Sequence, residues 1–172
     1  MNFPKTSELE TEHLLLRRFR EEDGEGFYRN VQKYPEVYDY MPDFRWAELA
    51  EQSASYCRMR IPYYELPYFF DWVITDKNNG EVIGEINASY SHKRKRASVG
   101  YCLGPEYWNR GLMSEALRTV TEFLENCPEI DHVEAECRYD NDASRRVLEK
   151  CGYVMYKYLP DTRIYVYRKP KR

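Results

Sequence analysis

SVGYCLGPEYWNRGLMSEALRTVTEF, residues 98–123, reads as a strand, a short turn and a helix. Large side chains alternate with smaller ones over residues 99–103, which is the two-residue period of a strand, and Gly-Pro at 104–105 ends it. From Leu112 onward the apolar residues recur at the i, i+3, i+4 spacing of one helix face. The stretch therefore predicts a β-strand followed by an amphipathic helix.

The joint between this strand and this helix is a candidate anion site. Backbone N–H groups at a helix start have no helical acceptor, so they can bind an anion, above all a phosphate. Gly111 would let the backbone approach such a group closely, although a plain strand-to-helix turn is the alternative. The sequence has neither a Walker loop nor a GxGxxG fingerprint. The residues expected to line the turn are Trp108, Asn109, Arg110, Gly111, Leu112 and Met113.

The segment GYCLGPEYWNRGLMSEAL, residues 100–117, resembles the acetyl-CoA-binding segment of the GNAT acyltransferases, in the branch that acetylates protein N-termini and related amines. The chain departs from the wider family pattern at Trp108 and Met113. By this resemblance, the turn binds the pyrophosphate of acetyl-CoA, and the backbone of Gly100, Tyr101, Cys102 and Leu103 binds the pantetheine arm. The positions that match the branch are Gly100, Tyr101, Trp108, Gly111, Glu115 and Ala116.

A second motif, YDNDASRRVLEKCGY at residues 139–153, resembles the closing motif of the same family. The resemblance implies that Asn141 hydrogen-bonds the pantetheine arm and that Ser144 lies near the sulfur. Asn141 and Ser144 also read as the N-cap and first turn of a helix. Many relatives carry a tyrosine where this chain has Leu148, so the acid that protonates the leaving thiolate is expected to be Ser144, with Tyr139 as the second choice. The matching positions are Asn141, Ser144, Lys150, Gly152 and Tyr153.

A carboxylate is expected to take the proton of the attacking amine. A protein α-amine has a pKa near 7.7–8.0 and needs little help, whereas the lysine pKa lies near 10.4. Glu85 is the first candidate, with Glu134 and Glu136 as rivals, and an exposed strand glutamate is the alternative reading of Glu85. No covalent cysteine step is expected, because Cys102 and Cys137 have no histidine nearby in sequence.

The rest of the chain predicts one domain, residues 1–172, of the α/β (α+β) class. By resemblance this is the GNAT fold: a mixed, mostly antiparallel sheet of about seven strands with a splayed parallel pair, flanked by about four helices. DKNNG at 76–80 and the basic run at 91–96 predict hairpin turns, and the aromatic segment 61–70 is either a packed loop or a wall of the acceptor site. Strands are expected at 13–20, 70–75, 82–90, 98–103, 132–139, 153–158 and 164–168, and helices at 21–34, 46–60, 112–124 and 141–151.

Composition narrows the classes of function. The 26 basic and 29 acidic residues give a net charge of −3, which argues against nucleic-acid binding. No apolar run approaches ~20 residues, so no membrane span is expected. The five cysteines include no CxxC pair, and with no secretory leader this predicts reduced thiols and a cytoplasmic location. Three scattered histidines argue against a metal site.

Three functions remain. The first is transfer of an acetyl group from acetyl-CoA to a primary amine, at a protein N-terminus or on a small molecule. The second is an acyl-CoA-binding regulatory domain without turnover, and the third is a protein- or RNA-binding module with a decayed cofactor turn. The first implies acetyl-CoA and an amine as partners, and a monomer or homodimer. The sequence leaves the acceptor open.

Overall fold

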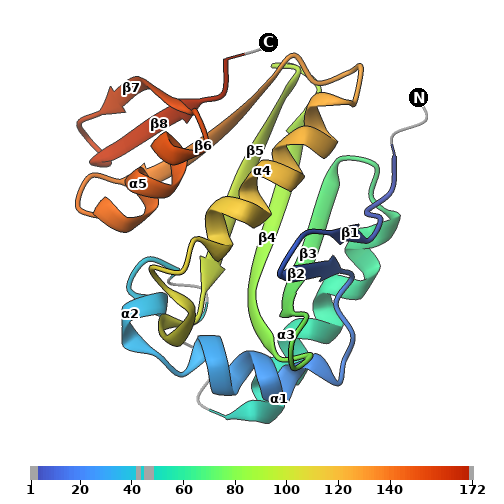
Figure 1. The fold of residues 1–172 in the computed structure, drawn as a ribbon. Helices are drawn as coiled ribbons and strands as arrows, with labels where there is room; N and C mark the ends of the chain where they lie inside the picture. Colours follow the sequence, from blue (N-terminus) through green and yellow to red (C-terminus); the bar gives the residue numbers. More distant parts are fainter. Residues whose placement is uncertain (1–3, 42–43, 45–48, 171–172) are drawn as a thin grey trace.

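The centre of the fold is an antiparallel meander of three strands (Figure 1). The computed structural model describes residues 4–41, 44 and 49–170, and the meander comprises β3 (Phe69–Asp76), β4 (Val82–Ser91) and β5 (Arg96–Leu103). Tight turns join these strands where the DKNNG and SHKRKR segments predict them. Gly80 takes a φ of +73° in the first turn, a conformation that glycine adopts without steric cost.

The sheet extends on both sides of the meander, in the order β1-β2-β3-β4-β5-β6-β8-β7. Every adjacent pair is antiparallel except β5 and β6, which run parallel. The mixed sheet predicted from the sequence is confirmed. It has eight strands among the described residues rather than about seven, because the two residues of β1 are too few to show a period. The outer strands are β1 (Leu9–Glu10), β2 (Leu14–Arg17), β6 (His132–Arg138), β7 (Val154–Leu159) and β8 (Ile164–Arg168).

Alternation along β3 divides the interior into two cores on opposite faces of the sheet. Trp72 and Ile74 belong to the larger core, whereas Val73 belongs to the smaller one. The larger core includes side chains of α4 (Leu112–Glu125) and α5 (Asp142–Lys150), so these two helices cover the same face. Both helices lie where the sequence predicts them.

Helices of the N-terminal third cover the smaller core. The helix expected at 21–34 is present over residues 23–32, and it changes from α-helical to π-helical hydrogen bonding at Tyr28. Gly24 packs closely on the next long helix, because a Cβ at Gly24 would lie 2.4 Å from Ala54 Cα. The helix expected from Trp46 begins at Ala50 in the part that the structure describes, and Trp46 lies outside that part. These elements are α1 (Asp23–Phe27), the π-helical η1 (Tyr28–Gln32), α2 (Pro35–Tyr38), α3 (Ala50–Arg60) and the 3₁₀ helix η3 (Ile61–Glu65).

The parallel pair β5 and β6 separates partway along its length. The register pairs Arg96 with His132 and ends at Val99 with Ala135, although β5 continues to Leu103 and β6 to Arg138. Each strand stays paired with its other neighbour, β5 with β4 and β6 with β8, so the two strands diverge as Figure 1 shows. The separation expected between these strands is therefore present. We call the gap between the unpaired ends, residues 100–103 of β5 and 136–138 of β6, the splay.

Candidate functional site

The turn between β5 and α4 has the backbone of an anion site. After one 3₁₀ turn, η4 (Pro105–Tyr107), Asn109 and Gly111 take left-handed φ values of 59° and 82°. Gly111 is the N-cap of α4, and the Glu115 N–H donates to its carbonyl at 3.1 Å. The N–H groups of residues 112–114 precede that bond, so they have no acceptor within the helix and are available to a ligand.

Side chains leave the mouth of this turn open and positively charged. A Cβ added at Gly111 would meet only the Lys150 ammonium within 4 Å, at 3.8 Å. Arg110 is exposed, and its guanidinium lies 5.6 Å from the centroid of the Tyr107 ring. Met113 is 7% exposed and packs in the larger core, so its bulk does not obstruct the turn. The turn therefore fits a phosphate group.

Backbone groups of β5 face the splay. Gly104 N–H donates to Ile83 of the β4 side, and Lys95 carbonyl accepts from Asp131 of the β6 side. Because ladder bonds alternate along a strand, even-numbered residues of β5 bond β4, and odd-numbered ones point toward β6. Beyond the last β6 pair, the odd residues are Tyr101 and Leu103. The Leu103 carbonyl accepts from Trp108 Nε1–H at 2.8 Å, which leaves the N–H groups of both residues and the Tyr101 carbonyl for a ligand.

Ser144 and Tyr101 meet across the splay. Asn141 caps α5, as predicted, because its Oδ1 accepts from the Ser144 N–H at 3.0 Å. The Ser144 hydroxyl lies 2.9 Å from the Tyr101 hydroxyl, and burial raises the pKa of that phenol. Tyr101 is thus a hydroxyl donor that the sequence reasoning missed, since it considered this residue only for cofactor binding. The i+2 alternation of β5 could have revealed it, because the pattern puts Tyr101 on the same face as Val99 and Leu103.

Leu148, where many relatives carry a tyrosine, and Tyr139, the second candidate for the acid, lie elsewhere. Leu148 is fully buried in the larger core, where a leucine serves packing. Tyr139 is 40% exposed, and the Arg163 guanidinium lies 5.6 Å from its ring centroid. Ser144 with Tyr101 is therefore the pair of hydroxyls that the fold places at the splay.

Glu85 lies on the opposite face of the sheet, under α3. Its side chain is 1% exposed, and Tyr56 of α3 donates a hydrogen bond of 2.7 Å to Oε2. Burial raises the pKa of Glu85 to about 7, against the opposing influence of the Arg60 charge and of bonds from Tyr56 and Asn87. Glu85 pairs in register with Cys102, one residue from the splayed backbone of Tyr101. A carboxyl group with a pKa near neutrality can exchange a proton at physiological pH.

The rival carboxylates differ in their surroundings. Glu134 is 2% exposed and accepts from Arg168 at 2.7 Å and from Arg96. Burial by itself would raise the pKa of Glu134, but these two guanidinium groups lower it below its ordinary value. Glu134 is therefore held ionised as an ion-pair partner. Glu136 is exposed and lies on the same sheet face.

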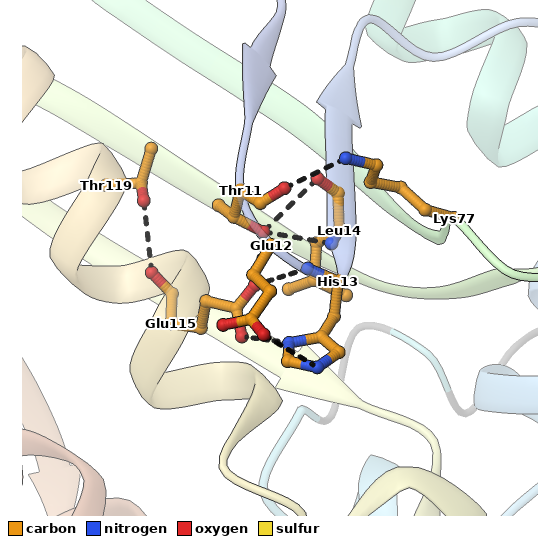
Figure 2. A network of polar contacts seen from close by, with 7 residues as sticks. All are labelled: Thr11, Glu12, His13, Leu14, Lys77, Glu115 and Thr119. Carbon is orange, nitrogen blue, oxygen red and sulfur yellow. Dashed lines mark hydrogen bonds and ion pairs between the residues drawn. The ribbon is translucent and has the colours of Figure 1, made fainter.

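Glu115, a motif residue in the first turn of α4, faces away from the anion site. Figure 2 shows its carboxylate against the turn between β1 and β2. It accepts from the His13 N–H and approaches His13 Nδ1, each at 2.9 Å, and it also accepts from the Thr11 hydroxyl. Glu115 thus ties the start of α4 to the turn between β1 and β2, at one edge of the sheet.

The five cysteines are free and buried. Burial raises the pKa of Cys137 to about 11 and raises that of Cys102 well above its usual value, so neither thiol is disposed to ionise. The described residues contain no group of three or more side chains suited to hold a metal ion. None of their helices combines the length and apolar character needed to span a membrane.

The chain resembles known acetyltransferases both in sequence and in fold. Residues 13–154 match the sequence profile of the acetyltransferase (GNAT) domain. The uncharacterized N-acetyltransferase YoaA of Bacillus subtilis (strain 168) is 29% identical over 174 residues, which cover 95% of this chain and 97% of that protein.

Solved structures of similar fold include two acetyltransferases. The microcin C7 self immunity acetyltransferase MccE, in complex with acetyl-CoA and AMP, matches with a TM-score of 0.80 at 16% identity, over 92% of this chain and 93% of that one. The ribosomal L7/L12 alpha-N-protein acetyltransferase RimL, in complex with coenzyme A, matches with a TM-score of 0.79 at 18% identity, over 95% and 97% of the two chains. At these identities the likeness shows a shared fold.

Proposed function

Because the chain belongs to the GNAT acetyltransferase family, we propose that it transfers the acetyl group of acetyl-CoA directly to a primary amine, at a protein N-terminus or on a small molecule. The observation that carries the proposal is the splay between β5 and β6. The anion-binding turn lies at the end of β5, and the Asn141–Ser144 segment follows β6. One site thus offers phosphate donors, unpaired strand backbone and a pair of hydroxyls.

Different residues at the splay suit different parts of the acetyl-CoA molecule. The N–H groups at the start of α4, with Arg110 and Lys150 beside them, suit the pyrophosphate. The free backbone groups of Tyr101 and Leu103 suit the amides of the pantetheine arm, as does the Asn141 side chain. This arrangement leaves the thioester near Ser144.

Acetyl-CoA supplies the acetyl group as a thioester, so its C–S bond breaks as the new C–N bond forms. A backbone N–H of β5 at the splay would hold the negative charge that develops on the carbonyl oxygen. The hydroxyl pair Ser144–Tyr101 would give a proton to the leaving sulfur: Ser144 would donate it, and Tyr101 would replace it through the contact between the two hydroxyls.

Glu85 would act as the general base, accepting the proton of the attacking amine through a water molecule. Its support is the pKa of about 7 and its position one strand away from β5, on the face opposite α4 and α5. Glu136 is the alternative, favoured by its exposure on that same face. An α-amine acceptor, with a pKa near 7.7–8.0, loses its proton readily to a base of this strength.

Release of free thiol tests the proposal. With acetyl-CoA and a panel of primary amines, we expect thiol release that depends on the amine and yields the N-acetyl product. Thermal stabilisation by CoA without turnover would instead favour an acyl-CoA-binding regulatory domain. If CoA gave no stabilisation either, the chain would be a binding module with a decayed cofactor turn, and the assignment of the splay would be wrong.

A further inference from the structure

A cavity of about 450 Å³ lies over β6, β7 and β8, on the sheet face opposite α5. Glu134 and Glu136 line it, whereas their neighbours Val133 and Ala135 point to the larger core beneath α5. Glu136 is the first residue of β6 beyond the last pair with β5. The cavity therefore begins beside the vertex of the splay and extends outward from it.

The walls of this cavity carry more positive than negative charge. Four cationic side chains, Arg94, Arg96, Lys157 and Arg168, face two carboxylates. One of these carboxylates, Glu134, is shared by Arg96 and Arg168, and the buried Nε of Arg96 has no hydrogen-bond partner within the described chain. Arg94 and Lys157 are exposed and make no side-chain ion pair among the described residues. A positive excess here contrasts with the net charge of −3 of the whole chain.

The phosphates of acetyl-CoA do not account for this excess. The turn that suits the pyrophosphate follows the last residue of β5, whereas Arg96 is the first residue of β5 and Arg94 lies two residues before it. Eight residues of extended strand separate the two places by about 26 Å. The cavity also lies on the opposite face of the sheet from α4. The occupant that suits this cavity is therefore an anion other than the phosphates of acetyl-CoA.

We propose that this cavity binds a carboxylate or phosphate of the acceptor while the acceptor's amine lies at the splay, an inference that rests on the proposed function. Residues 96–100 of β5 lead from the charged wall to the splayed backbone, a span on the order of 10 Å. A free amino acid is too short to bridge it, because its carboxylate is bonded to the carbon that bears the amine. The acceptor is therefore an amine with an anionic group several bonds away, as in a peptide with acidic residues after its first two.

Matched acceptors test this directly. An amidated Ala-Ala-Glu-Glu peptide is compared with amidated Ala-Ala-Gln-Gln, and aminohexyl phosphate is compared with aminohexanol, so that the two arms separate a peptide carboxylate from a phosphate. At low salt we expect the anionic member of at least one pair to show a kcat/KM about 10-fold higher, since each exposed charge pair contributes modestly. In the Arg94→Gln, Lys157→Gln double variant this preference should fall below about 3-fold. Lys93→Gln, on the same hairpin tip but outside the cavity wall, should retain it.

The outcomes separate this inference from the proposed function. Turnover with no preference for the anionic acceptors, or a preference that survives in the double variant, would overturn the cavity assignment and leave acetyl transfer intact. Absence of turnover with every amine would refute the proposed function. In that case the cavity assignment is tested by calorimetric binding of the same acceptors to the CoA-loaded protein. Tighter binding of an anionic acceptor by the wild type but not by the double variant supports the assignment. Equal binding of the anionic and neutral acceptors overturns it.

Discussion

Burial and nearby polar groups have opposite effects on the pKa of Glu85. Removal from water favours the neutral acid, whereas the Arg60 charge and the Tyr56 hydroxyl favour the carboxylate. Burial has the larger effect, so the pKa rises from 4.5 to about 7. The stabilising contribution of this group is therefore complete below about pH 4.5 and is lost as the pH rises toward about 7.

Glu85→Gln should remove this pH dependence. Glutamine keeps an oxygen that can accept from Tyr56 but carries no charge, so the variant should be more stable than the wild type at about pH 8, by up to about 3 kcal/mol. Near pH 4.5 the two proteins should be equally stable. Urea unfolding at both pH values measures the difference. Equal stability throughout would mean that Glu85 has an ordinary pKa.

The same substitution tests the assigned base. Glu85→Gln should lower kcat/KM by about 10²-fold and abolish the rise of activity through about pH 7. Glu136→Gln, on the same sheet face, is the matched control and should retain that rise. A pH–rate profile that loses its rise in the Glu136 variant and keeps it in the Glu85 variant would exchange the two roles.

The hydroxyl pair predicts non-additive kinetics. Ser144→Ala should lower kcat by about 10²-fold with little change in CoA affinity, and Tyr101→Phe should do the same, because the two hydroxyls contact each other. If they act as one unit, the double variant loses little more than either single variant. Steady-state kinetics with calorimetric CoA binding measures both quantities. Full additivity would show that the two hydroxyls act separately.

At the scale of elements, the turn before α4 depends on one left-handed glycine. Gly111→Val should abolish CoA binding, because a β-branched residue at a φ of 82° shifts the backbone that presents the N–H groups. Gly80→Val is the control, since Gly80 has a φ of 73° in the turn between β3 and β4 and a Cβ added there would meet no atom within 4 Å. Both variants should lose about 1–2 kcal/mol of stability. Normal CoA binding by the Gly111 variant would remove the phosphate assignment.

The start of α4 is held by the contacts drawn in Figure 2, and these predict a pH window. The hydrogen bond that His13 donates to Glu115 raises the pKa of His13, so its contribution is present below about pH 6.5 and fades as the pH rises. Burial would raise the pKa of Glu115, but bonds from Thr11 and His13 lower it, so its contribution is lost as the pH falls below about 4.5. The pair stabilises most between these values.

Glu115→Gln should therefore destabilise the protein most near about pH 5.5 and less near about pH 8. Glu12→Gln is the control, since Glu12 is exposed and lies 3.8 Å from the other ring nitrogen of His13. Urea unfolding of both variants at the two pH values provides the comparison. An equal loss at both would mean that the charge of His13 does not contribute.

At the scale of the whole molecule, the sequence predicts most of the architecture because local signals agree with it. Alternation over 99–103, the apolar face of α4 and the cap at Asn141 each specify an element by themselves. The splay followed only from the family resemblance, since no local pattern shows where two strands part. The close approach of Gly24 to Ala54 is a tertiary contact, which a helical period does not reveal.

The candidate site was predictable in part for the same reason. The turn residues and Ser144 lie in continuous motifs, so their neighbourhood follows from sequence order. The contact of Tyr101 with Ser144, and that of Tyr56 with Glu85, join residues 43 and 29 positions apart and arise only when the sheet assembles. The charged cavity brings a hairpin tip together with four strands, β5 to β8, whereas the local sequence of the tip indicates only a solvated turn.

Ligand linkage gives a prediction for the molecule as a unit. Acetyl-CoA at about 100 times its Kd should add about 2.7 kcal/mol to the free energy of unfolding, because it binds the folded splay and not the unfolded chain. Thermal unfolding at a series of acetyl-CoA concentrations measures it. The Gly111→Val variant should show no such shift, and an equal shift in that variant would place the ligand elsewhere.

The most direct test of the central claim is a crystal structure with acetyl-CoA bound. We expect the pyrophosphate on the N–H groups of residues 112–114, the pantetheine arm along the backbone of Tyr101 and Leu103, and the sulfur beside Ser144. Coenzyme bound at another surface would contradict it. So would β5 and β6 paired along their full length, past Val99 and Ala135.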